Sequence, residues 1–107
     1  MSENLSEEEQ LAQQLAEELR RLRVEDVVIQ SLITISSIGY RRLGLTDETK
    51  DDRDLQQAKL AIDTMAALTP VLESVVPEEL VRDFNQSVAS LQLAYAQAAG
   101  EGADGEG

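Results

Sequence analysis

Residues Val24 to Leu43 have the sequence VEDVVIQSLITISSIGYRRL, and this stretch decides the fold. Apolar side chains would cover most of its circumference as a helix, which predicts an element buried on most of its sides. The stretch is also rich in β-branched residues, which suit strands. We favour a helix because strands usually run about 4–8 residues and no turn signal interrupts this segment. Arg41 and Arg42 suit a last helical turn, and Gly44 suits a left-handed cap after it.

The residues before this stretch predict an amphipathic surface helix. Ser6-Glu7-Glu8-Glu9 matches a capping box, in which the side chains of Ser6 and Glu9 satisfy each other's backbone amides. Four leucines then recur at helical spacing and form a single apolar stripe. They are Leu11, Leu15, Leu19 and Leu22.

A polar loop, residues 45–53, is expected to lead into a third helix. Asp51 or Asp52 is predicted to cap it, with Asp54 in its first turn. Apolar residues recur at steps of three and four from Leu55 to Val76, and Pro70 interrupts them. Two alternatives stay open there: Thr69 is the N-cap and Pro70 the first position of a new short helix, or the proline kinks the existing one.

Pro77, followed by two glutamates, is predicted to open a last helix that ends at Gly100. The remaining sequence, GEGADGEG, combines glycines and acids and cannot bury a core. The sequence therefore predicts an all-α protein: one helical domain over residues 1–99, and a disordered Gly/acidic tail over residues 100–107. The domain would be a small four-helix bundle or a helical-hairpin assembly.

Composition disfavours several functions. The chain carries 9 basic and 21 acidic residues, a net charge of −12, which disfavours binding to nucleic acids and to anionic membranes. It contains no cysteine and no histidine, so it lacks the usual general base and the usual thiolate and imidazole metal ligands. We predict no catalytic residue, no cofactor and no metal, and hence that the protein is not an enzyme.

The acidic loop resembles a calcium-binding loop only in part. Asp47, Thr49 and Asp51 have the alternate spacing of such a loop. Asp52, however, stands where glycine is required, and Ala58 stands where a bidentate glutamate is required. Helix capping and a solvated loop are the favoured interpretation, and no metal binding is predicted.

Other polar residues have ordinary structural explanations. Asp63 follows Lys59 by four residues, which favours a salt bridge over a catalytic carboxylate. Tyr40 and Tyr95 are predicted to place their rings in the core and their hydroxyls at its edge. Five arginines are expected to complement helix dipoles and neighbouring acids rather than bind an anion. They are Arg20, Arg21, Arg23, Arg41 and Arg42.

The sequence predicts a cytoplasmic location. Residues 1–10 are acidic and contain no apolar run, unlike a signal peptide. The longest uncharged stretch, Val27 to Tyr40, is shorter than the roughly 20 residues that span a bilayer and contains several polar residues.

Three segments resemble a bacterial family catalogued as domain of unknown function 1844. They are the Ser/Thr-rich aliphatic run ending at Leu43-Gly44, the stretch DLQQAKLAID from Asp54 to Asp63, and LQLAY from Leu91 to Tyr95. The chain departs from the family pattern after Leu68, where Thr69-Pro70 replaces a short Lys-Thr-Gly-Asn-type turn. The resemblance implies a helical fold and supplies no activity or site residue.

The favoured function is a non-catalytic helical protein-interaction module whose partner is another protein or a second copy, as in a homodimer. The Val24–Leu43 helix has more apolar surface than three amphipathic neighbours easily cover, and Leu32 is expected in the core. The predicted interface residues are Ile29, Ile33 and Tyr40. The alternative is a small-molecule-binding protein or enzyme that uses carboxylate, arginine and tyrosine groups in a helical pocket.

Overall fold

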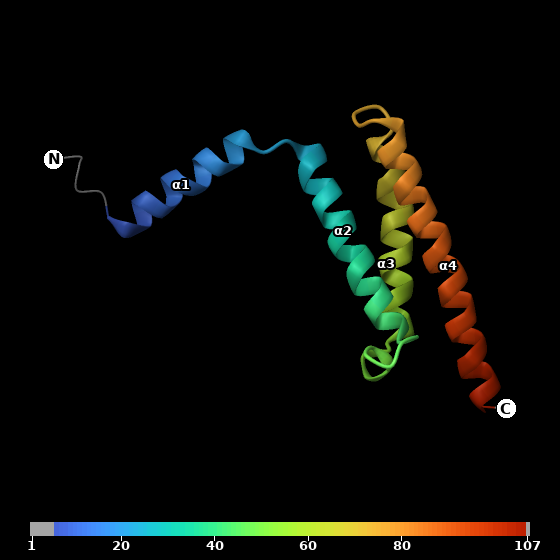
Figure 1. Ribbon diagram of the computed structural model, residues 1–107. Coiled ribbons are helices and arrows are strands. Elements are labelled where there is room, and N and C mark those ends of the chain that lie inside the picture. The colour runs from blue at the N-terminus through green and yellow to red at the C-terminus, as the bar shows by residue number, and fades with distance from the viewer. Residues whose placement is uncertain (1–5, 107) are drawn as a thin grey trace.

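The computed structural model describes the backbone of residues 6–106 and the side chains of residues 6–100. It contains four α-helices, confirming the all-α prediction, and no strand within the described residues (Figure 1). The helices are α1 (Glu7–Arg21), α2 (Val24–Leu43), α3 (Leu55–Leu68) and α4 (Glu78–Glu106). Two short 3₁₀ helices, η1 (Lys50–Asp52) and η2 (Thr69–Leu72), lie in the connections before and after α3.

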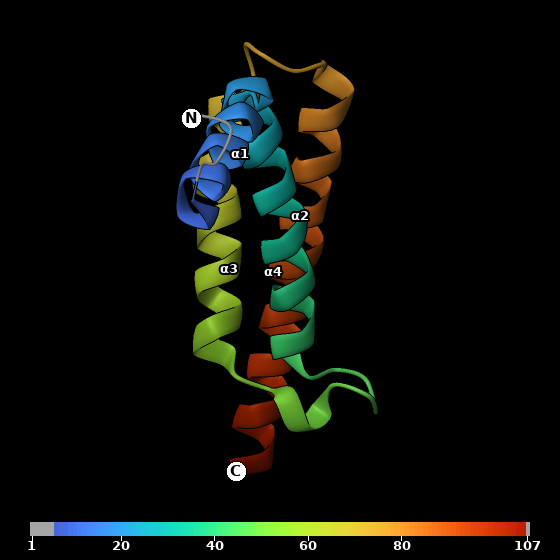
Figure 2. The same ribbon diagram turned by 90° about the vertical axis from the view of Figure 1, so that its left-hand side faces the viewer.

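Three of the four helices pack together. α2, α3 and α4 run alternately down and up and lie side by side in both views (Figures 1 and 2). α1 projects away from them at the N-terminal end of α2 (Figure 1). The predicted four-helix fold is therefore present as a three-helix assembly with one helix standing apart.

The core lies between α2, α3 and α4 and is almost entirely aliphatic. Leu32 is fully buried, as the sequence predicted, and its neighbours Val28 and Ile35 are half-buried against the same core. The fully buried large side chains are Leu32, Leu43, Met65, Leu72, Leu91 and Thr69. The helices are thus held together chiefly by the burial of apolar surface.

The helix ends mostly follow the predicted signals. The Ser6 hydroxyl accepts a hydrogen bond from the Glu9 amide at 3.1 Å, the first half of the predicted capping box. The second half differs, because the same hydroxyl donates to the Glu9 carboxylate at 3.1 Å. At the end of α2, Gly44 has a φ of 63° and a ψ of 35°, which is the predicted left-handed cap.

The connection between α2 and α3 corrects the predicted cap. Asp54, rather than Asp51 or Asp52, is the N-cap of α3, and its carboxylate accepts from the Gln57 amide at 3.2 Å. The two earlier aspartates lie in η1, and Asp52 pairs with Arg41 at 2.8 Å. The helix begins later than predicted because the loop first folds into this 3₁₀ turn against the end of α2.

Pro70 lies in η2, a short 3₁₀ helix that follows α3 without a break. α3 stops at Leu68 and η2 begins at Thr69, so a short helix is present as in the first alternative, but it begins one residue before the proline. Thr69 is not a cap: it is buried and its hydroxyl donates to the Met65 carbonyl at 2.7 Å. The chain then turns into α4 at Pro77, whose carbonyl accepts from the Leu80 amide at 3.1 Å.

The backbone of α4 continues as a helix to Glu106, past Gly100, where the sequence predicted its end. Glycine is tolerated inside a helix at a cost of about 1 kcal/mol, so it does not by itself terminate one. The side chains of residues 101–107 lie outside those described. The predicted disorder of residues 100–107 therefore stays a prediction.

Candidate protein-interaction site

α1 exposes its entire apolar stripe. Leu11, Leu15, Leu19 and Leu22 are between 52% and 67% exposed, and none of the helix's residues is buried. Isolated helices shorter than about 12–15 residues are marginal in water, and most helices in proteins are stabilised by packing of their apolar face. α1 has 15 residues. A leucine stripe on a helix of this length requires a covering surface.

A second apolar surface runs along the contact between α2 and α3. Val27 and Ile38 of α2 are each 47% exposed, and Leu60 of α3 is 59% exposed. Two recesses share Ile35 as a lining residue. The one nearer α1 is lined by Leu22 and α2 residues alone, and the other lies between α2 and α3. We call the two together the α2–α3 groove; it is lined by Leu22, Asp26, Val27, Gln30, Ser31, Thr34, Ile35, Ile38, Gln57, Leu60, Ala61 and Thr64.

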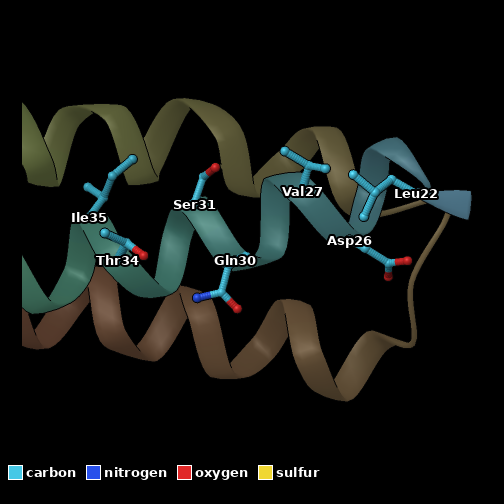
Figure 3. A pocket seen from close by; sticks show the side chains of 7 residues that line it. All are labelled: Leu22, Asp26, Val27, Gln30, Ser31, Thr34 and Ile35. Carbon is cyan, nitrogen blue, oxygen red and sulfur yellow. The ribbon is translucent and has the colours of Figure 1, made fainter. Parts of the chain in front are cut away.

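Figure 3 shows the end of the groove that lies nearest α1. Val27, Ser31 and Ile35 project from α2 on the side of α3, whereas Gln30 points the other way. Leu22, from the junction between α1 and α2, lies at the mouth of this recess. Leu22 therefore belongs both to the leucine stripe and to the groove lining. The other three leucines of the stripe lie on α1, which projects away from the groove.

Opposite charges mark the two ends of α2. Its first turn carries Glu25 and Asp26, and its last turn carries Arg41 and Arg42. A backbone hydrogen bond and then the Arg23 side chain, 3.2 Å from the carboxylate, lower the pKa of Glu25. Glu25 therefore remains ionised below its ordinary range. Asp26 lines the groove at the acidic end of α2, whereas Arg41 and Arg42 at the other end contact Asp52 and lie outside the groove lining.

The predicted interface residues lie on the other flank of α2. Ile33 and Tyr40 are 48% and 50% exposed, and Ile29 is half-buried against the core. At 100° per residue, Ile33 and Tyr40 fall on the side of the core-facing stripe opposite Val27 and Ile38. The structure thus leaves two apolar flanks on α2, of which the sequence analysis named one.

The arginine and tyrosine residues of the alternative function are not gathered in one pocket. Tyr40 and Arg41 line a shallow recess beside the α2–α3 connection, where Arg41 is engaged by Asp52. Tyr95 is half-buried against the core. Lys59 pairs with Asp63 at 2.8 Å, as predicted, and this hydrogen bond raises the pKa of Lys59. Arg41 and Lys59 are thus paired with carboxylates, and of these groups only Tyr40 and Arg41 share a recess.

Within residues 6–100, no group of three or more acidic residues is arranged to hold a metal ion. In the acidic loop, the Asp52 carboxylate pairs with Arg41, and Asp54 caps α3. The expectation that this loop binds no calcium stays a prediction. None of the helices in the described part of the chain is long and apolar enough to cross a membrane.

Comparison with protein-family models, with curated proteins and with solved structures gives no match. The resemblance to the bacterial family of unknown function therefore stays a prediction.

Sequence reasoning missed the groove, although one signal for it was present. Leu60 lies outside the stripe of α3 that includes Ala58 and Ile62 and faces the core. An apolar side chain off the buried stripe indicates a second covered face. Together with Val27 and Ile38, it marks the side of the α2–α3 pair that the sequence analysis left unassigned.

Proposed function

We propose that this chain is a non-catalytic helical module that acts by binding protein, including a second copy of itself. The observation that carries the proposal is the leucine stripe of α1, which no helix covers within the described residues. The α2–α3 groove is a second unpaired apolar surface in the same chain. Apolar surfaces of this kind mark sites of protein association.

The charge of the chain narrows the class of partner. A net charge of −12 disfavours nucleic acid and anionic membrane as the surface that covers α1. A protein surface with an apolar centre and basic groups at its rim fits both the leucine stripe and the glutamates around it. The cytoplasmic location expected from the sequence belongs to this proposal, as does the absence of catalysis.

The test is the mass of the full-length protein in solution. Light scattering and sedimentation equilibrium should be recorded from low micromolar to millimolar concentration. We expect the weight-average mass to rise from that of one chain toward that of two. A mass that stays at one chain over the whole range would overturn self-association as the mode of action.

A further inference from the structure

We propose that α1 docks in the α2–α3 groove of a second copy of the chain, antiparallel to α2, so that two chains exchange their first helices. This inference rests on the proposed function: the partner is a second copy of the chain, and the surface that binds α1 is the α2–α3 groove of that copy. The exchanged helix would cover the exposed leucines of α1. The same contact would cover Val27 and Ile38 of α2 and Leu60 of α3 in the partner.

The dimensions of the two surfaces agree. α1 is about 22 Å long, at about 1.5 Å per residue. The exposed groove residues Val27 and Ile38 are separated by about 17 Å along α2 by the same measure. Ser31, between them, is small and lets a leucine approach the α2 backbone. The four-leucine stripe is therefore long enough to fill the groove from end to end.

Charge selects the antiparallel direction. The first turn of α1 carries Glu7, Glu8 and Glu9, and its last turn carries Arg20 and Arg21. Antiparallel docking places the glutamates toward Arg42, which donates to the Asp52 carbonyl and not to a carboxylate. It places the arginines toward Asp26, which lines the groove. Arg41 and Glu25 are already paired with Asp52 and Arg23. Antiparallel docking also places opposite ends of the two helix dipoles together. Parallel docking would bring the acidic ends into contact and is disfavoured by like-charge repulsion.

The short junction favours exchange over folding back within one chain. Only Leu22 and Arg23 separate α1 from α2, and both are extended, with ψ angles of 140° and 145°. Antiparallel helix pairs use connections of about 2–5 residues with a few characteristic conformations. This junction is at the lower limit of that range, contains no glycine, and is extended at both residues. A short extended hinge of this kind directs α1 away from its own chain and so promotes exchange of the helix that it connects.

Exchange between two chains also closes the assembly. Each copy donates one α1 and offers one groove, so a two-fold arrangement satisfies both surfaces of both copies. No exposed leucine stripe then remains to recruit a third chain. The structure therefore favours a discrete dimer.

Two exposed isoleucines on opposite flanks of α2 provide a matched test. Ile38 lies in the groove and Ile33 lies on the flank that the sequence predicted as an interface; their exposed fractions are 47% and 48%. We expect Ile38→Glu to weaken dimerisation by about a hundredfold or more, because it buries an unpaired charge. Ile33→Glu should leave dimerisation unchanged. Loss of the dimer in Ile33→Glu alone would overturn the exchange and support the predicted interface.

Disulfide trapping separates exchange from folding back. The chain has no cysteine, so only introduced thiols react. Antiparallel docking with Leu22 near the start of α2 brings Leu15 close to Ser31 of the other copy. Chains carrying Leu15→Cys and chains carrying Ser31→Cys, one of them tagged, should be mixed, refolded together and oxidised. We expect a disulfide between the two kinds of chain in excess over either homodimer, with the linked peptides identified by mass spectrometry.

The double variant Leu15→Cys/Ser31→Cys gives the decisive comparison. Exchange predicts covalent dimers, whereas folding back gives an intramolecular disulfide in a monomer and would overturn the inference. Leu93→Cys, on an exposed position of α4, replaces Ser31→Cys as the control and should give no excess heterodimer. A dimeric wild type with an intramolecular disulfide would refute exchange but leave the proposed function standing. A monomeric wild type would refute both exchange and self-association, and would restrict the proposed function to binding a different protein.

Discussion

Gly39 of α2 faces Ala61 of α3 at a close approach of these two helices. A Cβ atom added to Gly39 would lie 3.1 Å from the Cβ atom of Ala61, which is tighter than ordinary van der Waals contact. Gly39 is itself buried. The absence of a side chain at this position thus sets the distance between α2 and α3.

Substitutions at this pair should couple. Gly39→Ala gains about 1 kcal/mol of helix propensity but pushes against a methyl group fixed to the α3 backbone. Ala61→Gly removes that methyl group. We expect the double variant to be more stable than the sum of the single effects, by about 0.5–2 kcal/mol. Urea unfolding of all four proteins measures this coupling, and strictly additive effects would show that the two atoms do not compete for space.

Gly44 is required for a different reason. Its φ of 63° is disfavoured for residues with a Cβ atom, and a Cβ there would lie 2.5 Å from the Cβ of Arg53. Gly44→Ala should lower the free energy of unfolding by at least about 1–2 kcal/mol. Gly44→Asn tolerates the left-handed conformation yet carries the same Cβ. If Gly44→Asn matches the wild type in urea unfolding, the contact with Arg53 is not a constraint.

Leu32 is the centre of the core and cannot accept a charge. Leu32→Asp would place an unpaired carboxylate at a site with no solvent exposure, at a cost of several kcal/mol against a total stability of about 5–15 kcal/mol. We expect the variant to lose most of its helical circular dichroism signal. Leu93→Asp, at a position 75% exposed on α4, is the control and should keep it. A folded Leu32→Asp protein would contradict this packing.

The sequence predicted the buried faces well because apolar spacing reports them directly. The stripe of α3 that begins at Leu55 supplies Ala58, Ile62 and Met65 to the core. It predicted the start of α3 less well, because several aspartates compete for the cap. The choice of Asp54 depends on η1 and on the pairing of Asp52 with Arg41, which are tertiary features.

The candidate site was predictable only in part for a similar reason. The leucine stripe of α1 shows that a face must be covered, but its spacing does not name the covering surface. Ile38 and Leu60 come together only when α2 and α3 pack, so no single segment contains the groove. The predicted interface at Ile33 came from one helix considered alone. The interface at Ile33 stays a prediction, separate from the proposed use of the groove.

Lowering the pH should weaken the first turn of α2, because it protonates Glu25. Its pKa is lowered below 4.5 in the folded protein, first by a backbone hydrogen bond and then by Arg23. Because the pKa of Glu25 is lower in the folded than in the unfolded chain, its carboxylate stabilises the folded state at any pH above the unfolded pKa. This stabilisation is lost as the pH falls through the folded pKa. NMR titration should give Glu25 a pKa below 4.5. Arg23→Ala should raise that pKa only partly, while Lys59→Met, at a distant pair, should not change it.

The C-terminal residues should add no stability beyond the last packed turn. Ala98 is fully buried, and its carbonyl accepts from the Arg53 guanidinium, so the contacts that hold α4 extend to this point. A Cβ added to Gly100 would meet nothing within 4 Å. Helix stability depends on packing, and the sequence after Gly100 is rich in glycine and acid.

Deletion of residues 101–107 should therefore leave the melting temperature unchanged. Gly100→Ala should raise the free energy of unfolding by up to about 0.5–1 kcal/mol, because Gly100 lies within α4 and an added Cβ meets no neighbour. An unchanged melting temperature in Gly100→Ala would show that α4 frays before this residue in solution. A fall in melting temperature on deletion would show that the tail contacts the folded domain. Calorimetry on the two variants and the wild type distinguishes all three results.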